Sequence, residues 1–506
     1  MSGFPWGQLS AELWLVGLGL VLLLVDLLPG RDERRGRLIG GLAFAGLLLG
    51  LVPASGACAP DGASPLLFGG LFAVDDFQIF FRLFVLLSTA LVVLLSFDYL
   101  EHITIDRGVF FALLVFGALA MCLLAGSRDL VMVYLAIEFL SITSYVLAAF
   151  LLGGDRDGLG ATRRSLEAGL KYLIYGAVAS GIMVYGFSLM YGLAGSTSLK
   201  AVGAAFAGPG NQPIKLLALL MALAGFTFKV SAVPFWQWAP DVYEGAPTPV
   251  AAFLAVGSKG AGIAVLVRFL TLSAGGFAGQ WETVLALIAV LTMFTGNLLA
   301  LVQTNLKRLM AYSGIAHAGY LLVGLVCNDE AGRGVQAMLI YLLAYLIMTI
   351  GVFAIIVWQQ RRTGRESIES LSGLAQEEPW MAVALTILLL SLVGIPPTVG
   401  FIGKLHLLVA TVNTPYLWLG LMIIINSVIS AYYYWNLARL AWLGEPAAVE
   451  APAEPVRPAR WAASVAYLCL VLTLVFAVWF GPLRDLSEAP LAGPDEAPAP
   501  IQWATR

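Results

Sequence analysis

A chain of 506 residues in which 60% of the residues are hydrophobic and only 12% are charged lies outside the composition of soluble domains, and it indicates a protein with many membrane-spanning helices. The net charge of −3 at pH 7 gives no indication of a nucleic-acid partner, and no basic cluster is interleaved with aromatic residues. Three histidines without metal-ligand spacing and four dispersed cysteines offer no visible site for a metal, a haem or an iron–sulfur cluster.

About 20 apolar residues are needed to cross a bilayer once, and fourteen such segments follow one another along the chain. The predicted helices span residues 11–28, 37–53, 76–97, 108–126, 129–152, 166–192, 214–238, 247–272, 282–302, 308–327, 334–359, 381–410, 415–443 and 461–481. The first eight residues lack a basic region and a cleavage site, so the first helix is expected to be retained. The predicted fold is therefore an all-α polytopic membrane protein.

The distribution of positive charge predicts the orientation in the membrane. Sixteen lysines and arginines lie in joints or helix ends that follow odd-numbered helices, whereas the opposite joints and the C-terminal tail hold six. Cytoplasmic loops are enriched in Lys and Arg, and an even number of crossings places both chain ends on one side. Both termini are therefore predicted to lie on the non-cytoplasmic side.

Two lysines lie inside predicted membrane helices near the middle of the chain. Lys229 closes an apolar run that starts at Ile214, and Pro234 follows five residues later, which predicts a kinked or broken helix beside the lysine. Lys259 lies within the next predicted helix. An isolated ammonium at mid-membrane costs about 2.5–3.5 kcal/mol on insertion scales, so each lysine needs a reason to be there. Snorkelling to an interface and pairing with a structural carboxylate remain alternatives to a role in transport.

A third lysine repeats this pattern. Lys404 follows Pro396 and Pro397 in a second apolar segment, which predicts a second broken helix. The chain is predicted to consist of three N-terminal helices in residues 1–107, a first five-helix repeat in 108–272, a second in 282–443, and a linker, last helix and tail in 444–506. Because five is odd, the consecutive repeats are inverted, and Lys229 and Lys404 each occupy the fourth helix of a repeat.

The acidic candidate is Glu138, which forms one polar stripe with Ser141 and Tyr145 at helical spacing. A carboxylate in a membrane needs a cation or a proton, and Lys229 is the candidate cation. His317 is placed between Lys259 and Lys404 in the sequence order of these polar residues. It is either a packing residue or a proton relay.

Five further charged residues have weaker assignments. Lys171 lies near the start of a helix that is predicted to enter the membrane from the cytoplasmic side. Its position is equally compatible with snorkelling to the interface and with a role in proton entry. Arg82 and Arg268 are interpreted as anchors near helix ends. Glu12 and Asp26 lie near the ends of the first helix and are interpreted as interfacial.

From about Asp129 to Arg439 the sequence resembles the antiporter-like membrane subunits of respiratory complex I. Five stretches carry the resemblance, namely AIEFLSITSYVL, LKYLIYGAVASGIMVYGFSLMYGLAGSTSL, FKVSAVPFWQWAPDVYEGAPTPVAAFLAVGSK, QTNLKRLMAYSGIAHAGYLLVG and SLVGIPPTVGFIGKLHLL. By position, the resemblance assigns Glu138 to the family's fifth-helix glutamate, Lys229 to the first broken helix, Lys259 to the bridging lysine, and Lys404 to the second broken helix.

The resemblance implies a function and its partners. It implies proton translocation in the bacterial inner membrane, driven by electron transfer from NADH to quinone elsewhere in a complex. It also implies that NADH, FMN, iron–sulfur clusters and quinone are used by other subunits, and that the partners are membrane-arm subunits and the bilayer. A subunit of an Mrp-type cation/proton antiporter, a membrane subunit of an energy-converting hydrogenase, and an assembly scaffold whose lysines pair structural charges remain alternatives.

Overall fold

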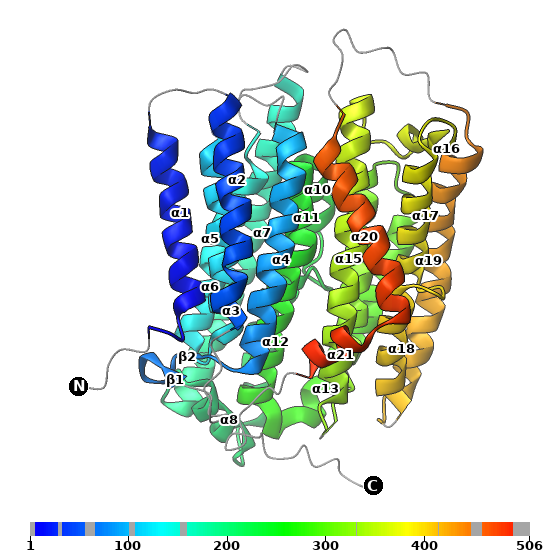
Figure 1. Ribbon diagram of the computed structural model, residues 1–506. Helices are drawn as coiled ribbons and strands as arrows, with labels where there is room; N and C mark the ends of the chain where they lie inside the picture. Colours follow the sequence, from blue (N-terminus) through cyan, green and yellow to red (C-terminus); the bar gives the residue numbers. More distant parts are fainter. Residues whose placement is uncertain are drawn as a thin grey trace.

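The computed structural model describes residues 6–28, 33–55, 66–100, 107–151, 159–329, 331–412, 414–446 and 458–488, and helices form most of the described chain (Figure 1). The N-terminal part contains α1 (Ser10–Leu27), α2 (Glu33–Leu49), α3 (Leu51–Ser55) and α4 (Asp76–Leu100). A short antiparallel hairpin of β1 (Leu66–Leu67) and β2 (Phe72–Ala73) lies before α4. This part confirms three predicted spanning helices.

The middle of the chain contains three short helices in addition to the longer ones. Its helices are α5 (Arg107–Gly126), α6 (Leu130–Ala148), α7 (Leu159–Ala194), α8 (Leu199–Ala207), α9 (Gln212–Val230), α10 (Trp238–Gly245), α11 (Thr248–Phe253) and α12 (Lys259–Ala274). The predicted segment over 214–238, for which a break beside Lys229 was expected, is helical only to Val230, and α10 starts eight residues later. The nine-residue α8, too short to span a bilayer, was not predicted.

The last part of the chain contains the second broken helix. Its helices are α13 (Ala278–Ala300), α14 (Leu306–Val326), α15 (Arg333–Thr363), α16 (Leu374–Glu377), α17 (Pro379–Val393), α18 (Val399–Val412), α19 (Leu417–Leu443), α20 (Arg460–Val478) and α21 (Gly481–Ser487). The predicted helix over 381–410 is two helices, α17 and α18.

The described residues contain 12 helical segments that are long and apolar enough to cross a membrane. One of them, Thr248–Ala300, includes both α11–α12 and α13, which make two crossings, and α17 and α18 are shorter apolar helices that together make one interrupted crossing. The fourteen predicted crossings are thereby confirmed. In Figure 1, α1 begins at the same end of the bundle at which α21 lies, as an even number of crossings requires.

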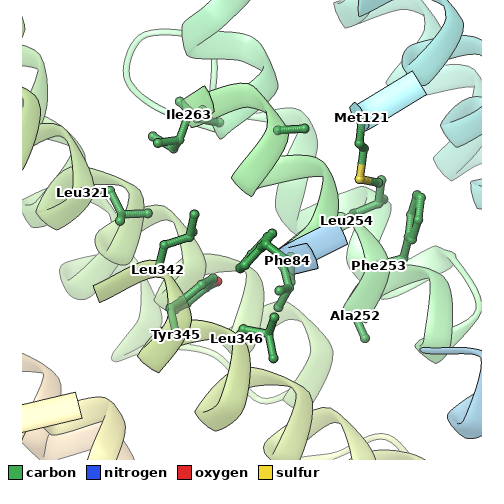
Figure 2. Close-up of a cluster of buried hydrophobic side chains, with 14 of the residues drawn as sticks. Phe84, Met121, Ala252, Phe253, Leu254, Ile263, Leu321, Leu342, Tyr345 and Leu346 are labelled. Atoms are coloured by element: carbon green, nitrogen blue, oxygen red, sulfur yellow. The ribbon is translucent and has the colours of Figure 1, made fainter. Parts of the chain in front are cut away.

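Tight packing joins the two halves of the bundle around α15, which contacts α4, α14, α17, α18 and α20. Figure 2 shows Phe84 of α4, Met121 of α5, Phe253 of α11 and Tyr345 of α15 in one buried cluster. A Cβ atom at Gly260 would lie 2.4 Å from the ring of Phe84, so the absence of a side chain there allows α12 to approach α4. The helices around the buried lysines are therefore held in place by packing.

The interpretation of Arg82 and Arg268 as interfacial anchors was wrong. Arg82 is fully buried and forms two hydrogen bonds with the carboxylate of Glu12, at 2.9 and 2.6 Å. Arg268 is 1% exposed and forms two 2.7 Å hydrogen bonds with Asp75 at the start of α4. Bidentate geometry of this kind compensates part of the cost of removing both charges from water. Glu12 is correspondingly buried, whereas Asp26 lies 3.8 Å from Arg35 with a quarter of its side chain exposed.

Three of the four cysteines behave as small apolar side chains. Cys122, Cys327 and Cys469 are free and buried. Cys58 lies outside the described residues.

Candidate functional site

Lys229 lies in the last turn of α9, immediately before the helix break. The helix ends because Ser231 adopts a left-handed conformation with a φ of 61°, and its amide donates back to the carbonyl oxygen of Phe228 at 3.1 Å. Pro234 lies within the non-helical segment that follows, which confirms the predicted break. Lys229 is 1% exposed, and its Nζ donates to Ser141 Oγ at 3.2 Å. The lysine is therefore held inside the bundle at the end of a half-helix.

Glu138 lies on α6 one turn before Ser141 and is half-buried. Its Oε1 atom is buried and has no hydrogen-bond partner, and no ion pair in the described part of the chain joins it to Lys229. The other two members of the predicted polar stripe do face the lysine region, because Ser141 contacts Lys229 and the ring of Tyr145 packs edge-on against Tyr172 at 4.7 Å. The charge coupling of Glu138 to Lys229 stays a prediction.

Lys259 begins α12 directly after a π-helical segment, Leu254–Ser258. Such segments widen one turn of a helix and are frequent at functional sites. The 1% exposed lysine donates from Nζ to the carbonyl oxygen of Gly314 on α14, and Nζ lies 5.7 Å from the centre of the Tyr345 ring. A Cβ atom at position 314 would lie 2.9 Å from Nζ, so the glycine leaves the space that the ammonium occupies.

The second helix break lies between α17 and α18. The helix α17 ends at Val393, and Gly394 follows with a φ of 90°, a conformation that glycine adopts without strain. Pro396 and Pro397 lie in the non-helical segment before α18 begins at Val399. The position of the break confirms the prediction made from the two prolines.

Lys404 on α18 turns back towards the end of α17. Its Nζ donates to the carbonyl oxygens of Leu392 at 3.1 Å and Val393 at 2.8 Å, and to Ser427 Oγ at 3.0 Å. It also lies 4.7 Å from the centre of the Tyr320 ring. The last carbonyls of a helix have no partner within that helix and carry partial negative charge, so they are suited to a buried cation. Lys229 thus lies in the last turn of one half-helix, and the ammonium of Lys404 lies at the C-terminal end of another.

The helix α14 connects Lys259 with Lys404. Gly314 accepts the hydrogen bond from Lys259, His317 lies one turn further along, and Tyr320 lies a second turn further, against Lys404. Six residues of α-helix rise about 9 Å. The structure therefore places His317 between the two lysines in space, as the sequence order predicts.

Both ring nitrogens of His317 are satisfied by tyrosines. Nδ1 lies 2.5 Å from the hydroxyl of Tyr341, and Nε2 lies 3.4 Å from the hydroxyl of Tyr434, which also hydrogen-bonds Ser313. The hydroxyls can donate or accept, so the network is compatible with either ring tautomer. These contacts allow both the packing role and the relay role that the sequence left open.

The sequence did not reveal a group of polar residues beyond His317. Asn297 on α13 donates from Nδ2 to the hydroxyl of Tyr320 at 3.2 Å and to Asn426 Oδ1 at 3.0 Å, and it accepts from the hydroxyl of Tyr433 at 3.0 Å. Two asparagines within apolar helices are a signal that could have indicated this network. The tyrosines gave no such signal, because aromatic residues are also common in packing roles.

Lys171 lies apart from the buried lysines in a cluster of ion pairs, and its side chain is 39% exposed. Its Nζ lies 2.7 Å from a carboxylate oxygen of Glu167 and 2.8 Å from Asp241 of α10. Arg308 of α14 lies 2.6 Å from the other oxygen of Asp241 and 3.0 Å from Glu244. The cluster therefore ties α7, α10 and α14 together at the end of the bundle at which α7 begins.

The fold and this site define a class, that of polytopic membrane proteins in which two broken helices position a series of buried lysines. Residues 127–430 match the family described as NADH:quinone oxidoreductase/Mrp antiporter, transmembrane region. NADH-quinone oxidoreductase subunit N of Chlorobium chlorochromatii is 40% identical over 496 residues, which cover 95% of this chain and 94% of that protein. The chain belongs to this family and, within it, groups with subunit N of the NADH-quinone oxidoreductases.

Solved structures agree with this assignment. A chain of respiratory complex I from Thermus thermophilus matches with 31% identity and a TM-score of 0.76, covering 95% of this chain and 100% of the other. A chain of the Mrp complex from Dietzia sp. matches with a TM-score of 0.79 and 21% identity, covering 96% of each chain. The second match is a likeness of fold alone.

Proposed function

We propose that this chain translocates protons as a membrane-arm subunit of NADH:quinone oxidoreductase, using energy released by electron transfer in other subunits. The observation that carries this proposal is that Lys229, Lys259 and Lys404 are each at least 96% buried, and that no carboxylate lies within ion-pair distance of any of them in the part of the chain that the structure describes. In a scaffold, such lysines are expected to be paired with structural carboxylates.

The surroundings of the three lysines suit groups that gain and lose a proton. Each ammonium contacts hydroxyl or carbonyl oxygens and an aromatic ring, namely Ser141 and Tyr172 at Lys229, Gly314 and Tyr345 at Lys259, and Ser427 and Tyr320 at Lys404. Neutral oxygens can bind an ammonium as acceptors, and a hydroxyl can also donate to a neutral amine. Proton exchange at these contacts therefore leaves no carboxylate hydrogen-bonded to the lysine behind, in contrast to the salt-bridged Arg268.

The proposed path begins at Lys229, continues through Lys259 and His317, and ends at Lys404, from which the proton leaves outward. Glu138 stabilises the charged form of Lys229 across Ser141, and Lys171 lies at the end of the bundle proposed for proton entry. The excess of lysine and arginine in the joints at that end supports its assignment to the cytoplasm. Both termini are accordingly proposed to lie on the opposite side of a bacterial inner membrane.

The chain is proposed to carry no redox chemistry of its own. NADH, FMN, iron–sulfur clusters and quinone are assigned to other subunits of the complex, and the neighbours of this chain are assigned to another antiporter-like subunit and small membrane-arm subunits. The 40% identity to subunit N of Chlorobium chlorochromatii over nearly the full length favours this complex over an Mrp-type exchanger, to which the likeness is one of fold.

The experiment is NADH-driven proton uptake into inverted membrane vesicles, with the amount of assembled complex measured in the same membranes. We expect Glu138→Gln and Lys229→Ala to lower proton uptake while assembly is maintained. Sodium movement is measured in parallel without NADH, because an exchanger would move Na⁺ under that condition. Unchanged proton uptake in assembled Lys229→Ala complexes would overturn the proposal.

A further inference from the structure

The non-helical segment between α9 and α10 follows the turn that carries Lys229, and its backbone amides need partners inside the protein. The amides of its first two residues donate back to carbonyl oxygens of α9. Pro234 has no N–H group. The amide of Val233, directly before it, donates to Oγ1 of Thr292 on α13 at 3.0 Å. Because a membrane interior offers no water to an unpaired amide, this contact supports the helix break.

The hydroxyl of Thr292 has a fixed orientation. The side chain is fully buried, and the hydroxyl donates to the carbonyl oxygen of Ile288, one turn earlier on α13, at 2.6 Å. Its single proton is thereby used, and its oxygen is left to accept from the amide of Val233, which can only donate. Thr292 thus provides an acceptor that its own helix holds in place, and the contact joins residues 59 apart in the sequence.

The helix α13 is a rigid support for this contact. A Cβ atom at Gly296 would lie 2.4 Å from the backbone nitrogen of Ala316, so α13 and α14 approach each other closely. The next residue, Asn297, is hydrogen-bonded to Tyr320 of α14 at 3.2 Å and to Asn426 of α19 at 3.0 Å. All of these residues belong to the predicted second repeat, so the break in the first repeat is fastened to the second.

The far end of the non-helical segment is fastened to the turn that carries Lys229. Trp238 begins α10, and its indole Nε1 donates to the carbonyl oxygen of Phe228 at 3.0 Å. The break is therefore closed onto α9 at this end and held at Val233 by α13. A displacement of Val233 acts on the last turn of α9, where Lys229 donates to Ser141 Oγ at 3.2 Å.

We propose that Thr292 is a positioning residue for Lys229, contributed by the second repeat to the break in the first. The hydrogen bond to the amide of Val233 fixes the end of α9 and with it the distance from the Lys229 ammonium to Ser141. This inference rests on the proposed function, since it assigns a residue that keeps Lys229 in place for proton transfer. Thr292 itself neither gains nor loses the transferred proton.

The test compares Thr292→Val, Thr292→Ser and Thr295→Val in the purified complex in sealed proteoliposomes. Valine has nearly the shape of threonine but no hydroxyl, so it leaves the amide of Val233 unpaired, whereas serine keeps the acceptor. Thr295 lies three residues further along α13 and is partly exposed, so it is a matched control for loss of a threonine hydroxyl from that helix. The measured quantity is the ratio of protons moved to NADH oxidised, together with the amount of assembled complex.

We expect Thr292→Val to lower the ratio of protons to NADH, by up to the loss that Lys229→Ala causes. Thr292→Ser is expected to retain most of the ratio, and Thr295→Val to match wild type. The double variant Thr292→Val/Lys229→Ala is expected to match Lys229→Ala, because both changes act on the same step. A further loss in the double variant would show that Thr292 acts apart from Lys229 and would overturn the inference.

The outcomes separate this role from the proposed function. If Lys229→Ala lowers the ratio while Thr292→Val matches wild type, the positioning role is wrong and the lysine path stands. If Lys229→Ala also leaves the ratio unchanged, the proposed function fails and the positioning role fails with it. A smaller amount of Thr292→Val complex with an unchanged ratio would show that the contact is only structural. An equal loss of the ratio in Thr292→Ser would show that the packing of the side chain matters and not its hydroxyl, and either result overturns the inference.

Discussion

Gly314→Ala tests the position of Lys259 without changing any charge. The added Cβ atom would lie 2.9 Å from Nζ of Lys259 and 3.0 Å from the hydroxyl of Tyr345, whereas ordinary contacts begin at 3.4 Å. The ammonium must therefore move by about 0.5 Å, away from the carbonyl oxygen that accepts its hydrogen bond. Since a misplacement of about 1 Å can slow a reaction about 100-fold, we expect proton uptake to slow by about 3- to 10-fold.

The fold should tolerate this substitution, because the atoms that must move are the ends of two side chains. Alanine is also a better helix former than glycine by about 1 kcal/mol, so α14 itself is not weakened. The assay is the rate of NADH-driven proton uptake divided by the amount of assembled complex. Gly181→Ala on α7 is the control, because its Cβ would have nothing within 4 Å. A wild-type rate in Gly314→Ala would refute the importance of the Lys259 position.

Three further changes test the packing and the charge networks, each read from the thermal midpoint of the purified complex. Asp75→Asn leaves Arg268 buried without a carboxylate, so we expect the free energy of unfolding to fall by about 3–5 kcal/mol. A thermal midpoint equal to that of wild type would contradict this. Gly296→Ala places a Cβ atom 2.4 Å from a backbone nitrogen of α14, so we expect overpacking to lower the free energy of unfolding by about 1–3 kcal/mol. Gly279→Ala is the control, because its added Cβ atom has no neighbour within 4 Å and should not change the midpoint. Burial raises the pKa of Asp241, but hydrogen bonds from two basic neighbours outweigh it and hold that pKa below the usual 3.8. A carboxyl whose pKa is lowered in the folded state stabilises the fold at pH values above its ordinary pKa, and this stabilisation is lost as the pH falls through the pKa of the folded state. Asp241→Asn should therefore lower the thermal midpoint at neutral pH and flatten the decline of the midpoint in acid. Parallel curves of midpoint against pH for the variant and wild type would argue against this contribution of Asp241.

The sequence predicted the crossings and the helix breaks well, because hydropathy and proline act locally. Pro234 and the pair Pro396 and Pro397 marked segments that cannot continue a helix, and both breaks lie there. The helices nevertheless end earlier than the prolines require, since Ser231 and Gly394 adopt left-handed conformations first. Such conformations depend on the tertiary surroundings as well as on residue type.

The buried ion pairs show what hydropathy alone could not predict. Arg268 looked like an anchor near a helix end, but its partner Asp75 lies 193 residues away in the sequence. A side chain that finds such a partner no longer needs to reach the membrane surface, so the same residue type changes its role with the fold.

The contacts between the tyrosines of the candidate site and the lysines were not predicted, for a similar reason. Tyr172, Tyr320 and Tyr345 each lie against one of the three buried lysines, yet they are far from that lysine in sequence. Their hydroxyls belong to a site only after the helices have packed. The lysines themselves were recognisable, because a charge in an apolar helix is rare wherever it lies.

A role of the buried lysines in carrying protons can be measured as the number of protons moved per NADH oxidised by the purified complex in sealed proteoliposomes. The comparison is wild type against Lys404→Ala, at equal amounts of assembled complex. We expect fewer protons per NADH in the variant, because its outward step is removed. An unchanged ratio, with NADH oxidation and assembly intact, would show that Lys404 is structural and does not carry protons.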